Sequence, residues 1–380
     1  MDDRTADPPP LALPSRVDVL ILGGGPAGLA TAITLARLEQ QVLLLARPDS
    51  GKDKVGESLA PTAVPILQQL GVWTRFMAGG HQPCYGNKSA WGSATLRHYD
   101  FINDPNGHAW RLNRPLFERQ LAEQATAVGV QQSAAFTIEV VTRIDDAWQL
   151  TLRSIDHQHH QRLMLRAAFV VDASGRHSWF ARRQGAGRWF TDQQVALVAF
   201  LVPAGAPQVE TTTLIEAVAA GWWYSARLPD GRLVTMLMTD PDLHDAHRMT
   251  TTEGWQQLLA HTTHTATRVT QGGYQLADPP RLVAAASGRL DHLWGDGWLA
   301  VGDAAMTYDP LAAHGLTLAL ASGRDAALAV TAHLRGTVDA LAAYEWRLTT
   351  AYEAYAERRH HYYCAEQRWP AAPYWLRRHT

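Results

Sequence analysis

Glycines near the start of this 380-residue chain have the spacing of a phosphate-binding turn. The stretch 23–28, Gly-Gly-Gly-Pro-Ala-Gly, follows an apolar run and precedes apolar residues at helical spacing, so a strand, a turn and a helix are expected in succession. In such a unit Gly23 allows the tight turn, Gly25 lets backbone amides approach a pyrophosphate, and Gly28 lets the helix pack closely on its strand. The spacing predicts a dinucleotide site at Gly23, Gly25, Pro26, Ala27 and Gly28.

A second glycine stretch, near the other end of the chain, could bind a different part of the same ligand. In residues 300–305, Asp303 comes just after a buried apolar run, where its carboxylate can accept hydrogen bonds from ribityl hydroxyls. A helix is expected at 315–333, and free N–H groups at its start can stabilise negative charge on a reduced flavin. The two stretches together predict one FAD site, with a second side formed by Gly302, Asp303, Pro310, Gly315 and Leu316.

The elements that must position these residues are strands and helices in a mixed order. Residues 17–22 and 42–45 flank the first helix as a βαβ unit, which implies a parallel sheet. Alternating residues predict a three-stranded meander at 136–144, 148–154 and 162–166, followed by a separate buried strand at 169–171. A second, antiparallel sheet is expected from strands at 195–202, 222–228 and 232–238.

The predicted fold is therefore a mixed α/β (α+β) arrangement. A Rossmann-like FAD-binding domain is interleaved with an antiparallel-sheet substrate domain and is followed by C-terminal helices. We expect the FAD-binding domain at 16–75, 106–185 and 286–335, the substrate domain at 76–105 and 186–285, and the C-terminal helical segment at 336–380.

Composition excludes several classes of function. The formal net charge of −2 gives no electrostatic case for a nucleic acid or an anionic membrane as partner. The sequence shows no signal peptide and no apolar run long enough to span a bilayer, and two cysteines cannot form a disulfide framework, so a cytoplasmic location is expected. His157, His159 and His160 have no carboxylate or cysteine partner at ligand-like spacing, so no metal is expected.

Motifs spread over nearly the whole chain resemble one family. They are the opening glycines, Val55-Gly56-Glu57-Ser58-Leu59, Arg114 with Phe117, Val171-Asp172-Ala173-Ser174-Gly175-Arg176, and the segment from Gly302-Asp303 to Gly315. The chain resembles FAD-dependent monooxygenases of the hydroxybenzoate hydroxylase fold, in the branch that contains the flavin-dependent tryptophan halogenases. The resemblance implies that Ser58, Arg114 and Asp172 also contact the cofactor. Residues 87–92, 221–226 and the ending 368–375 are similar to the flavoprotein maturases of cysteine tryptophylquinone amine and amino-acid oxidases.

The chain departs from the pattern of the family at two alanines. Ala46 stands where a carboxylate ordinarily binds the adenosine ribose, which leaves Arg47 or Asp49 for that contact. Ala312 stands where the halogenases carry a glutamate beside their halide site. Lys88 lies near the place of their catalytic lysine, although an alignment through Trp91 does not put it on that position. These departures favour hydroxylation over halogenation.

The resemblance implies a monooxygenase that acts through a flavin C4a-hydroperoxide on a bulky aromatic small molecule or on a tryptophan-bearing polypeptide during quinone-cofactor maturation. His314, Lys88 and Glu57 are the candidate catalytic residues. A neutral His314 is expected because the helix dipole disfavours its cation. Reducing equivalents could come from NAD(P)H or from a separate flavin reductase. The alternatives are a flavin-dependent halogenase of an indole or other aromatic and a flavoprotein chaperone that binds an oxidase precursor without catalysis.

Overall fold

A mixed sheet carries both glycine-rich stretches at one edge. The computed structural model describes residues 13–48, 51, 53–155, 161–205 and 210–380, and the strands of this sheet follow the order β20-β21-β11-β1-β2-β8, with β10 and β9 added beside β11. The strands are β1 (Arg16–Leu22), β2 (Val42–Leu45), β8 (Gln131–Ser133), β9 (Phe136–Ile144), β10 (Ala147–Ser154), β11 (Arg162–Asp172), β20 (Trp294–Gly295) and β21 (Trp298–Ala300).

The register of the parallel strands explains why distant loops meet. Leu22 pairs with Leu45 on one side and with Asp172 on the other, and Asp172 pairs with Ala300. The carboxyl ends of β1, β2, β11 and β21 therefore lie side by side, and the loops that follow them leave the same edge of the sheet. The βαβ unit and the parallel sheet predicted from the sequence are confirmed.

The meander is present, but one predicted boundary in it is wrong. Strands β9, β10 and β11 pair antiparallel in succession, as expected. The separate strands predicted at 162–166 and 169–171 are one continuous strand, β11. Its first half pairs with β10, and its second half pairs with the central strand β1. Because β11 has a neighbouring strand to pair with along its whole length, its backbone stays extended through Ala167 and Ala168.

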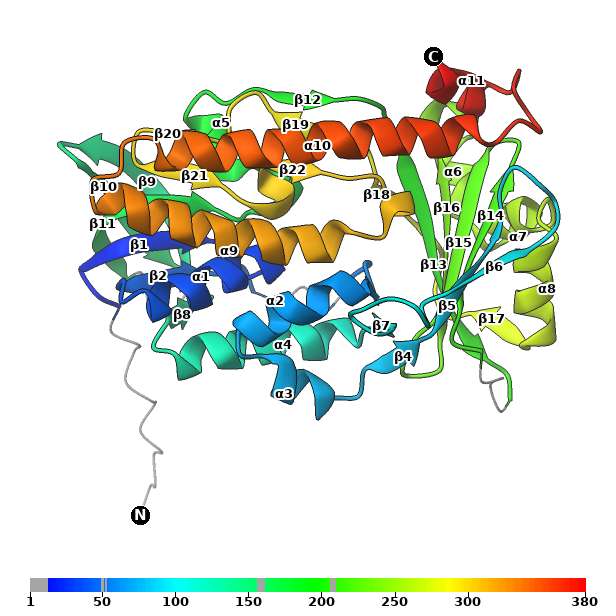
Figure 1. Cartoon of the computed structure of the whole chain (residues 1–380), viewed down its shortest axis with the longest axis horizontal. Helices are drawn as coiled ribbons and strands as arrows, with labels where there is room; N and C mark the ends of the chain where they lie inside the picture. Colours follow the sequence, from blue (N-terminus) through cyan, green and yellow to red (C-terminus); the bar gives the residue numbers. More distant parts are fainter. Residues whose placement is uncertain (1–12, 49–50, 52, 156–160, 206–209) are drawn as a thin grey trace.

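A second sheet stands at the other end of the molecule, as Figure 1 shows. Its order is β17-β13-β16-β15-β14-β5-β6, with β18 also beside β13. The predicted antiparallel strands β13, β15 and β16 are confirmed at its centre. The strands are β5 (Gly86–Ala90), β6 (Arg97–Asp100), β13 (Val195–Pro203), β14 (Thr213–Val218), β15 (Gly221–Arg227), β16 (Leu233–Thr239), β17 (Tyr274–Leu276) and β18 (Arg281–Ala284).

The core of this second sheet accounts for two of the tryptophans. Strand β16 is buried along its whole length, as a central strand covered on both faces must be. The neighbouring residues Trp222 and Trp223 of β15 are both fully buried and point to opposite faces, where they join two separate apolar clusters. These two rings form the core and do not line a substrate site.

Two three-stranded sheets and the helices complete the fold. One small sheet is β3 (Ser58–Leu59), β7 (Ala109–Arg111) and β4 (Gln82–Cys84), and the other is β12 (Arg188–Phe190), β19 (Gly288–Leu290) and β22 (Met306–Thr307). The α-helices are α1 (Pro26–Arg37), α2 (Val64–Gln69), α3 (Trp73–Met77), α4 (Arg114–Ala127), α5 (Trp179–Arg183), α6 (Ala246–Met249), α7 (Thr252–Leu259), α8 (His264–Gln271), α9 (Gly315–Leu334), α10 (Ala340–Cys364) and α11 (Pro373–His379). Short 3-10 helices lie at Pro61–Ala63, Gly175–His177, Pro241–Leu243, Gly302–Ala304 and Pro310–Ala312.

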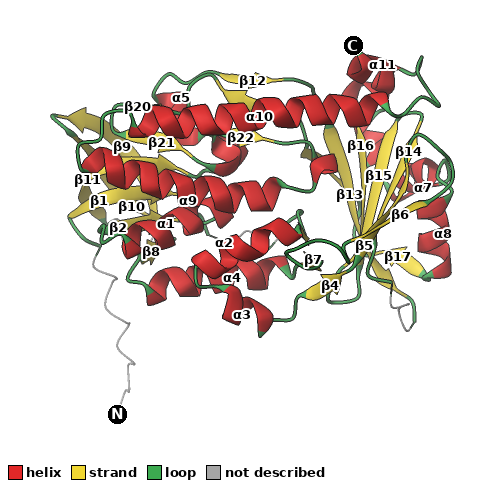
Figure 2. Cartoon of the chain, in the orientation of Figure 1, coloured by secondary structure: helices red, strands yellow, loops and turns green. Residues whose placement is uncertain are grey.

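The C-terminal helices connect the two main sheets. Helices α1 and α9 pack against each other beside the parallel sheet, and α10 packs on α9. Figures 1 and 2 show α10 running from the parallel sheet to the second sheet, where α11 and the C-terminus lie. The mixed α/β fold class is confirmed, whereas the domain boundaries stay a prediction. In the described part of the chain, no helix is long and apolar enough to cross a membrane.

Candidate functional site

A cavity of about 370 Å³ opens where the parallel sheet faces the second sheet. Residues from both glycine-rich stretches line it, namely Gly25, Pro26, Ala27, Asp303, Pro310, Gly315 and Leu316. The opposite wall is formed mainly by apolar side chains of the second sheet, namely Ala196, Met236, Met238 and Val283. The structure thus brings together the two stretches that the sequence predicted to share one ligand.

The helix starts at the cavity offer unpaired backbone donors. Gly25 is the N-cap of α1 and His314 is the N-cap of α9, and neither helix has a side chain capping its first turn. A Cβ atom added at Gly25 or at Gly315 would meet no atom within 4 Å, so both glycines border open space. Two open helix N-termini facing one cavity suit a ligand that carries negative charge at two places, as the pyrophosphate and the reduced ring of FAD do.

Other glycines are required by close packing and do not face the cavity. Gly23 has a φ of +124°, and a Cβ there would overlap the carbonyl group of Ala173. A Cβ at Gly28 would overlap the carbonyl oxygen of Gly23. Gly302 has a φ of +55°, and a Cβ there would lie 2.6 Å from the Cβ of Ala27. These three positions hold α1 close to its own strand and to the loop after β21.

Besides these three glycines, two further predicted cofactor contacts lie away from the cavity lining. Asp172 is fully buried, and its carboxylate accepts hydrogen bonds from the backbone N–H groups of Ser174, Phe180 and Ala181 at 2.8 to 2.9 Å. It therefore holds the loop after β11 and the start of α5. Arg47 is exposed beyond the end of β2, next to the half-buried Ala46, while Asp49 lies outside the described residues.

Arg114 and Asp303 border the cavity, and each side chain already contacts other groups of the protein. Arg114 donates to the carbonyl oxygens of Val55 (2.9 Å) and Gly56 (2.6 Å), so it fixes the turn that precedes Glu57. Asp303 lies 3.5 Å from Nε of Arg176 and stays partly exposed. The Asp303 carboxylate retains lone pairs for a ribityl hydroxyl.

A polar corner interrupts the apolar side of the cavity. Glu57, Ser58 and Tyr224 line it, and Arg111 is fully buried behind them. The Tyr224 hydroxyl donates to Glu57 Oε1 and accepts a 2.8 Å hydrogen bond from Arg111, while Ser58 Oγ lies 2.9 Å from the same hydroxyl. Arg111 also donates to Ser58 Oγ and to Thr213 Oγ1. Residues from β3, β7, β14 and β15 thus meet in one network.

Electrostatics fix the protonation of this corner. Burial, helped by the neighbouring Glu57, raises the pKa of Tyr224 against the opposing effect of Arg111, so the phenol keeps its proton and donates. Burial opposes the charge on Arg111, but Tyr224, Cys84 and Glu57 outweigh it and raise its pKa. Arg111 therefore stays cationic without a direct carboxylate partner, and Glu57 balances its charge through Tyr224.

The other two candidate catalytic residues lie outside the cavity lining. His314 is exposed on one side at the start of α9, next to the cavity-lining Ala313. Desolvation by the surrounding protein and the nearby Arg358 lower the pKa of His314, a direction that favours the neutral imidazole, while its catalytic role stays a prediction. Lys88 on β5 forms an ion pair with Glu210.

Sequence reasoning missed Tyr224, Arg111 and Asp309 as site residues. Tyr224 lies in the predicted strand 222–228, and nothing in that prediction marked it as a site residue. Arg111 lies three residues before the Arg114 that the family pattern marks. Asp309, which also lines the cavity, gave a weak signal in the Asp309-Pro310 pair. Among the described residues, no group of histidines, cysteines and carboxylates could hold a metal ion, while His157, His159 and His160 lie outside them.

Comparisons with known proteins identify the family of the chain and its cofactor. The model of the FAD binding domain family matches residues 16–360. The putative FAD-dependent oxidoreductase LodB of Marinomonas mediterranea is 29% identical over 367 residues, which cover 96% of this chain and 97% of LodB. Two solved structures share the fold at 23% identity and 96% coverage of this chain. The myxobacterial chondrochloren halogenase CndH has a TM-score of 0.86 over 86% of its chain, and the peptidyl tryptophan dihydroxylase QhpG has 0.77 over 79%.

The chain belongs to the FAD-binding family, because the family match spans most of its length. It is an FAD-dependent oxidoreductase with the fold shared by flavin-dependent halogenases and hydroxylases, and the cofactor predicted from the glycine-rich stretches is confirmed. The resemblance drawn from the motifs is confirmed as well.

The glycines of the first turn allow a matched test of binding against folding. In Gly25→Ala the new methyl group enters open cavity space, so we expect FAD affinity to fall about tenfold or more while the melting temperature of the apoprotein stays near that of the wild type. In Gly28→Ala the methyl group overlaps the backbone, so we expect the free energy of unfolding to fall by about 1 to 3 kcal/mol. FAD titration by fluorescence and thermal unfolding check both. An apoprotein equally destabilised by the two changes would contradict the assignment.

Proposed function

We propose that this protein is an FAD-dependent monooxygenase that hydroxylates a bulky aromatic, with a tryptophan on a polypeptide as the favoured substrate. The observation that carries the proposal is the cavity. The predicted FAD site forms one side of it, and the opposite side is an apolar wall that includes the polar corner at Glu57, Ser58 and Tyr224. QhpG, which shares the fold, is a peptidyl tryptophan dihydroxylase, and this supports the choice of substrate.

The chain offers residues for three parts of FAD, namely the pyrophosphate, the ribityl chain and the ring. The backbone at Gly25, Pro26 and Ala27 would hold the pyrophosphate, Asp303 would accept from the ribityl chain, and the start of α9 at Gly315 and Leu316 would face the ring. Reduced FAD activates molecular oxygen for transfer to an aromatic ring, with electrons from NAD(P)H or from a separate flavin reductase. The task of the protein is then to orient the substrate and to exclude water.

The polar corner suits an indole. An indole ring needs apolar contacts for its faces and one acceptor for its N–H group. Met236, Met238 and Val283 supply the apolar contacts, and the lone pairs that Glu57 does not use toward Tyr224 and the Gly56 N–H can supply the acceptor. Because the Tyr224 hydroxyl already donates to Glu57 and accepts from Arg111, we assign the substrate contact to Glu57.

Halogenation is the second candidate function, since the halogenase CndH shares the fold. It would require a lysine that handles hypohalite, and Lys88 is the candidate of this chain. The ion pair of Lys88 with Glu210, together with Ala312 in place of the halogenase carboxylate, favours hydroxylation.

Incubation of the protein with FAD, a reductant, oxygen and a tryptophan-bearing oxidase precursor tests the proposal. We expect the precursor to gain one or two oxygen atoms by mass spectrometry, with the same yield in halide-free buffer. A product that carries a halogen would instead establish the second candidate. Precursor maturation that persists when flavin reduction is blocked would favour the chaperone alternative.

Lys88→Met separates the two chemistries. For a hydroxylase we expect turnover to stay within about twofold of the wild type, because a partly exposed ion pair contributes only about 1 kcal/mol or less to stability. Although burial of Glu210 opposes its ionisation, Lys88, Arg268 and Thr212 lower its pKa to about 2. The stability that the ion pair adds to the wild type should therefore be full above the ordinary glutamate pKa of 4.5 and shrink as the pH falls toward 2. Loss of all turnover in Lys88→Met would support halogenation.

Glu57→Gln tests the acceptor for the indole N–H group. We expect kcat/KM to fall about 10- to 100-fold, mostly through KM, because a hydrogen bond to a charged acceptor is lost. FAD affinity should stay unchanged. An N-methylated indole substrate is the matched control, since it cannot make the bond and should react equally slowly with both proteins. An equal loss for both substrates would show that Glu57 only supports the fold.

A further inference from the structure

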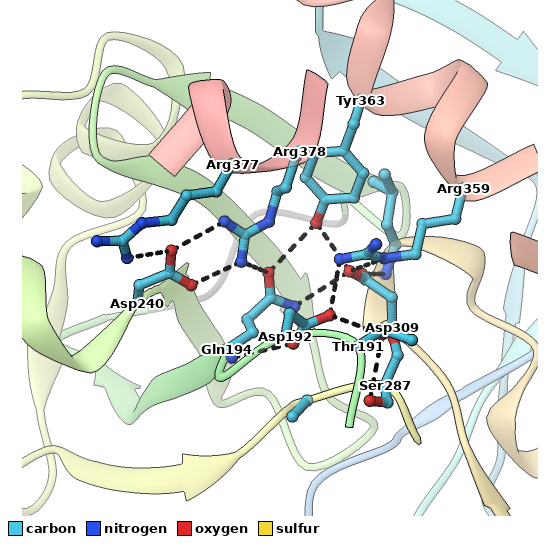
Figure 3. Close-up of polar contacts among 12 residues, drawn as sticks. Thr191, Asp192, Gln194, Asp240, Ser287, Asp309, Arg359, Tyr363, Arg377 and Arg378 are labelled. Atoms are coloured by element: carbon cyan, nitrogen blue, oxygen red, sulfur yellow. Dashed lines mark hydrogen bonds and ion pairs between the residues drawn. The ribbon is translucent and has the colours of Figure 1, made fainter. Parts of the chain in front are cut away.

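One face of α10 binds the loop that lines the cavity before α9. Tyr355, Arg359 and Tyr363 are spaced four residues apart, so their side chains lie above one another on the same side of the helix. All three reach Asp309, the first residue of the loop 309–314. Figure 3 shows Arg359 and Tyr363 converging on Asp309.

The bonds to Asp309 engage both its carboxylate and its backbone. Oδ2 accepts from Tyr363 at 2.8 Å, from Arg359 Nε at 3.1 Å and from Gln194 Nε2 at 3.2 Å. Oδ1 accepts from the backbone N–H of Leu311 at 2.9 Å, and the backbone N–H of Asp309 donates to the Tyr355 hydroxyl at 2.6 Å. Asp309 is only 2% exposed although it borders the cavity, because these donors surround it.

One guanidinium in this cluster lies between two carboxylates. Arg359 bridges Asp309 and Asp192, which lies 2.8 Å from Nη2. Burial opposes the charge on Arg359, but Asp309, Tyr363 and Asp192 outweigh it and raise its pKa. Burial and Asp309 raise the pKa of Tyr363, so its hydroxyl stays a donor.

The loop needs such external support. Ala313 has a φ of +50°, a left-handed conformation that costs a residue with a Cβ atom about 1 kcal/mol or more. A strained residue persists only where its surroundings determine its conformation. The loop itself supplies the bond from Leu311, and the remaining bonds to Asp309 come from α10 and from Gln194 next to β13.

Helix α11 holds α10 in place. Arg378 forms a buried ion pair with Asp240 at 2.7 Å, and Tyr374 donates to Gln194 at 2.6 Å. The hydroxyl oxygens of Tyr374 and Tyr363 lie 3.2 Å apart. Figure 3 shows the contacts that lead from Arg378 through Gln194 to Asp309.

We propose that Tyr355, Arg359 and Tyr363 are positioning residues that fix the loop 309–314 against bound FAD, so that the C-terminal helices shape the flavin side of the cavity. They do not line the cavity themselves and act through Asp309. The inference concerns the bound cofactor and does not depend on which aromatic is oxidised.

Tyr355→Phe and Tyr352→Phe form a matched pair. Both tyrosines lie on α10, both are about equally buried, and both rings contact Tyr308. Only Tyr355 accepts from the Asp309 backbone, and its hydroxyl also lies 2.9 Å from Ser287 Oγ. We expect Tyr355→Phe to weaken FAD binding about fivefold, because the bond that supports the loop at Asp309 is lost, and to shift the reduction potential and visible spectrum of bound FAD. In Tyr352→Phe the FAD affinity, the reduction potential and the visible spectrum should match those of the wild type.

Thermal unfolding of the two apoproteins separates positioning from general stability. Equal effects of the two variants on FAD affinity and potential would overturn the proposal. A loss of melting temperature in Tyr355→Phe with unchanged potential and spectrum would also overturn it, because it would mean that the bond only stabilises the fold. Arg359→Lys should restore part of the affinity and potential lost in Arg359→Gln, since it keeps the charge beside Asp309. Because these measurements use no aromatic substrate, their failure is distinguishable from failure of the proposed hydroxylation.

Discussion

The rest of the structure depends on the close approach of backbone at the carboxyl edge of the parallel sheet. Gly28 and Gly302 allow α1 to lie against its own strand and against the loop after β21, at distances that leave no space for a side chain. Only this approach lets the starts of α1 and α9 open into the same cavity. Both helices then offer unpaired N–H groups to one ligand, and the proposed FAD site rests on this arrangement.

The substrate side follows a different principle, the balance of a buried charge. Among the described residues Arg111 has no carboxylate in direct contact, and Glu57 compensates its charge through the hydroxyl of Tyr224. The bonds from both Nη atoms of Arg111 tie β3, β14 and β15 to β7, whereas its Nε atom is buried without a partner in the described part of the chain. The network also places a carboxylate beside the apolar side chains of the cavity, and the proposed contact with an aromatic N–H group rests on this placement.

The sequence predicted well where the signal is local. The turn at Gly23 to Gly28, the strands β13, β15 and β16, and helix α9 all follow from periodicity and glycine spacing over short windows. The boundary between 162–166 and 169–171 was wrong because β11 changes its partner from β10 to β1 partway along, and no local pattern records a change of partner. The family motif predicted that Asp172 contacts the cofactor. In the structure its carboxylate accepts hydrogen bonds from backbone N–H groups at Ser174 and Phe180.

The sequence by itself determined the cofactor and the mixed α/β class, since both depend on the short-range spacing of glycines and apolar residues. Only the tertiary structure decided which polar side chains meet. Glu57 and Tyr224 are 167 positions apart in the chain, and Asp309 meets α10 residues 46 to 54 positions away. Contacts of this kind depend on how sheets and helices pack, because hydrogen bonds of buried groups are satisfied by whichever partner the fold brings near.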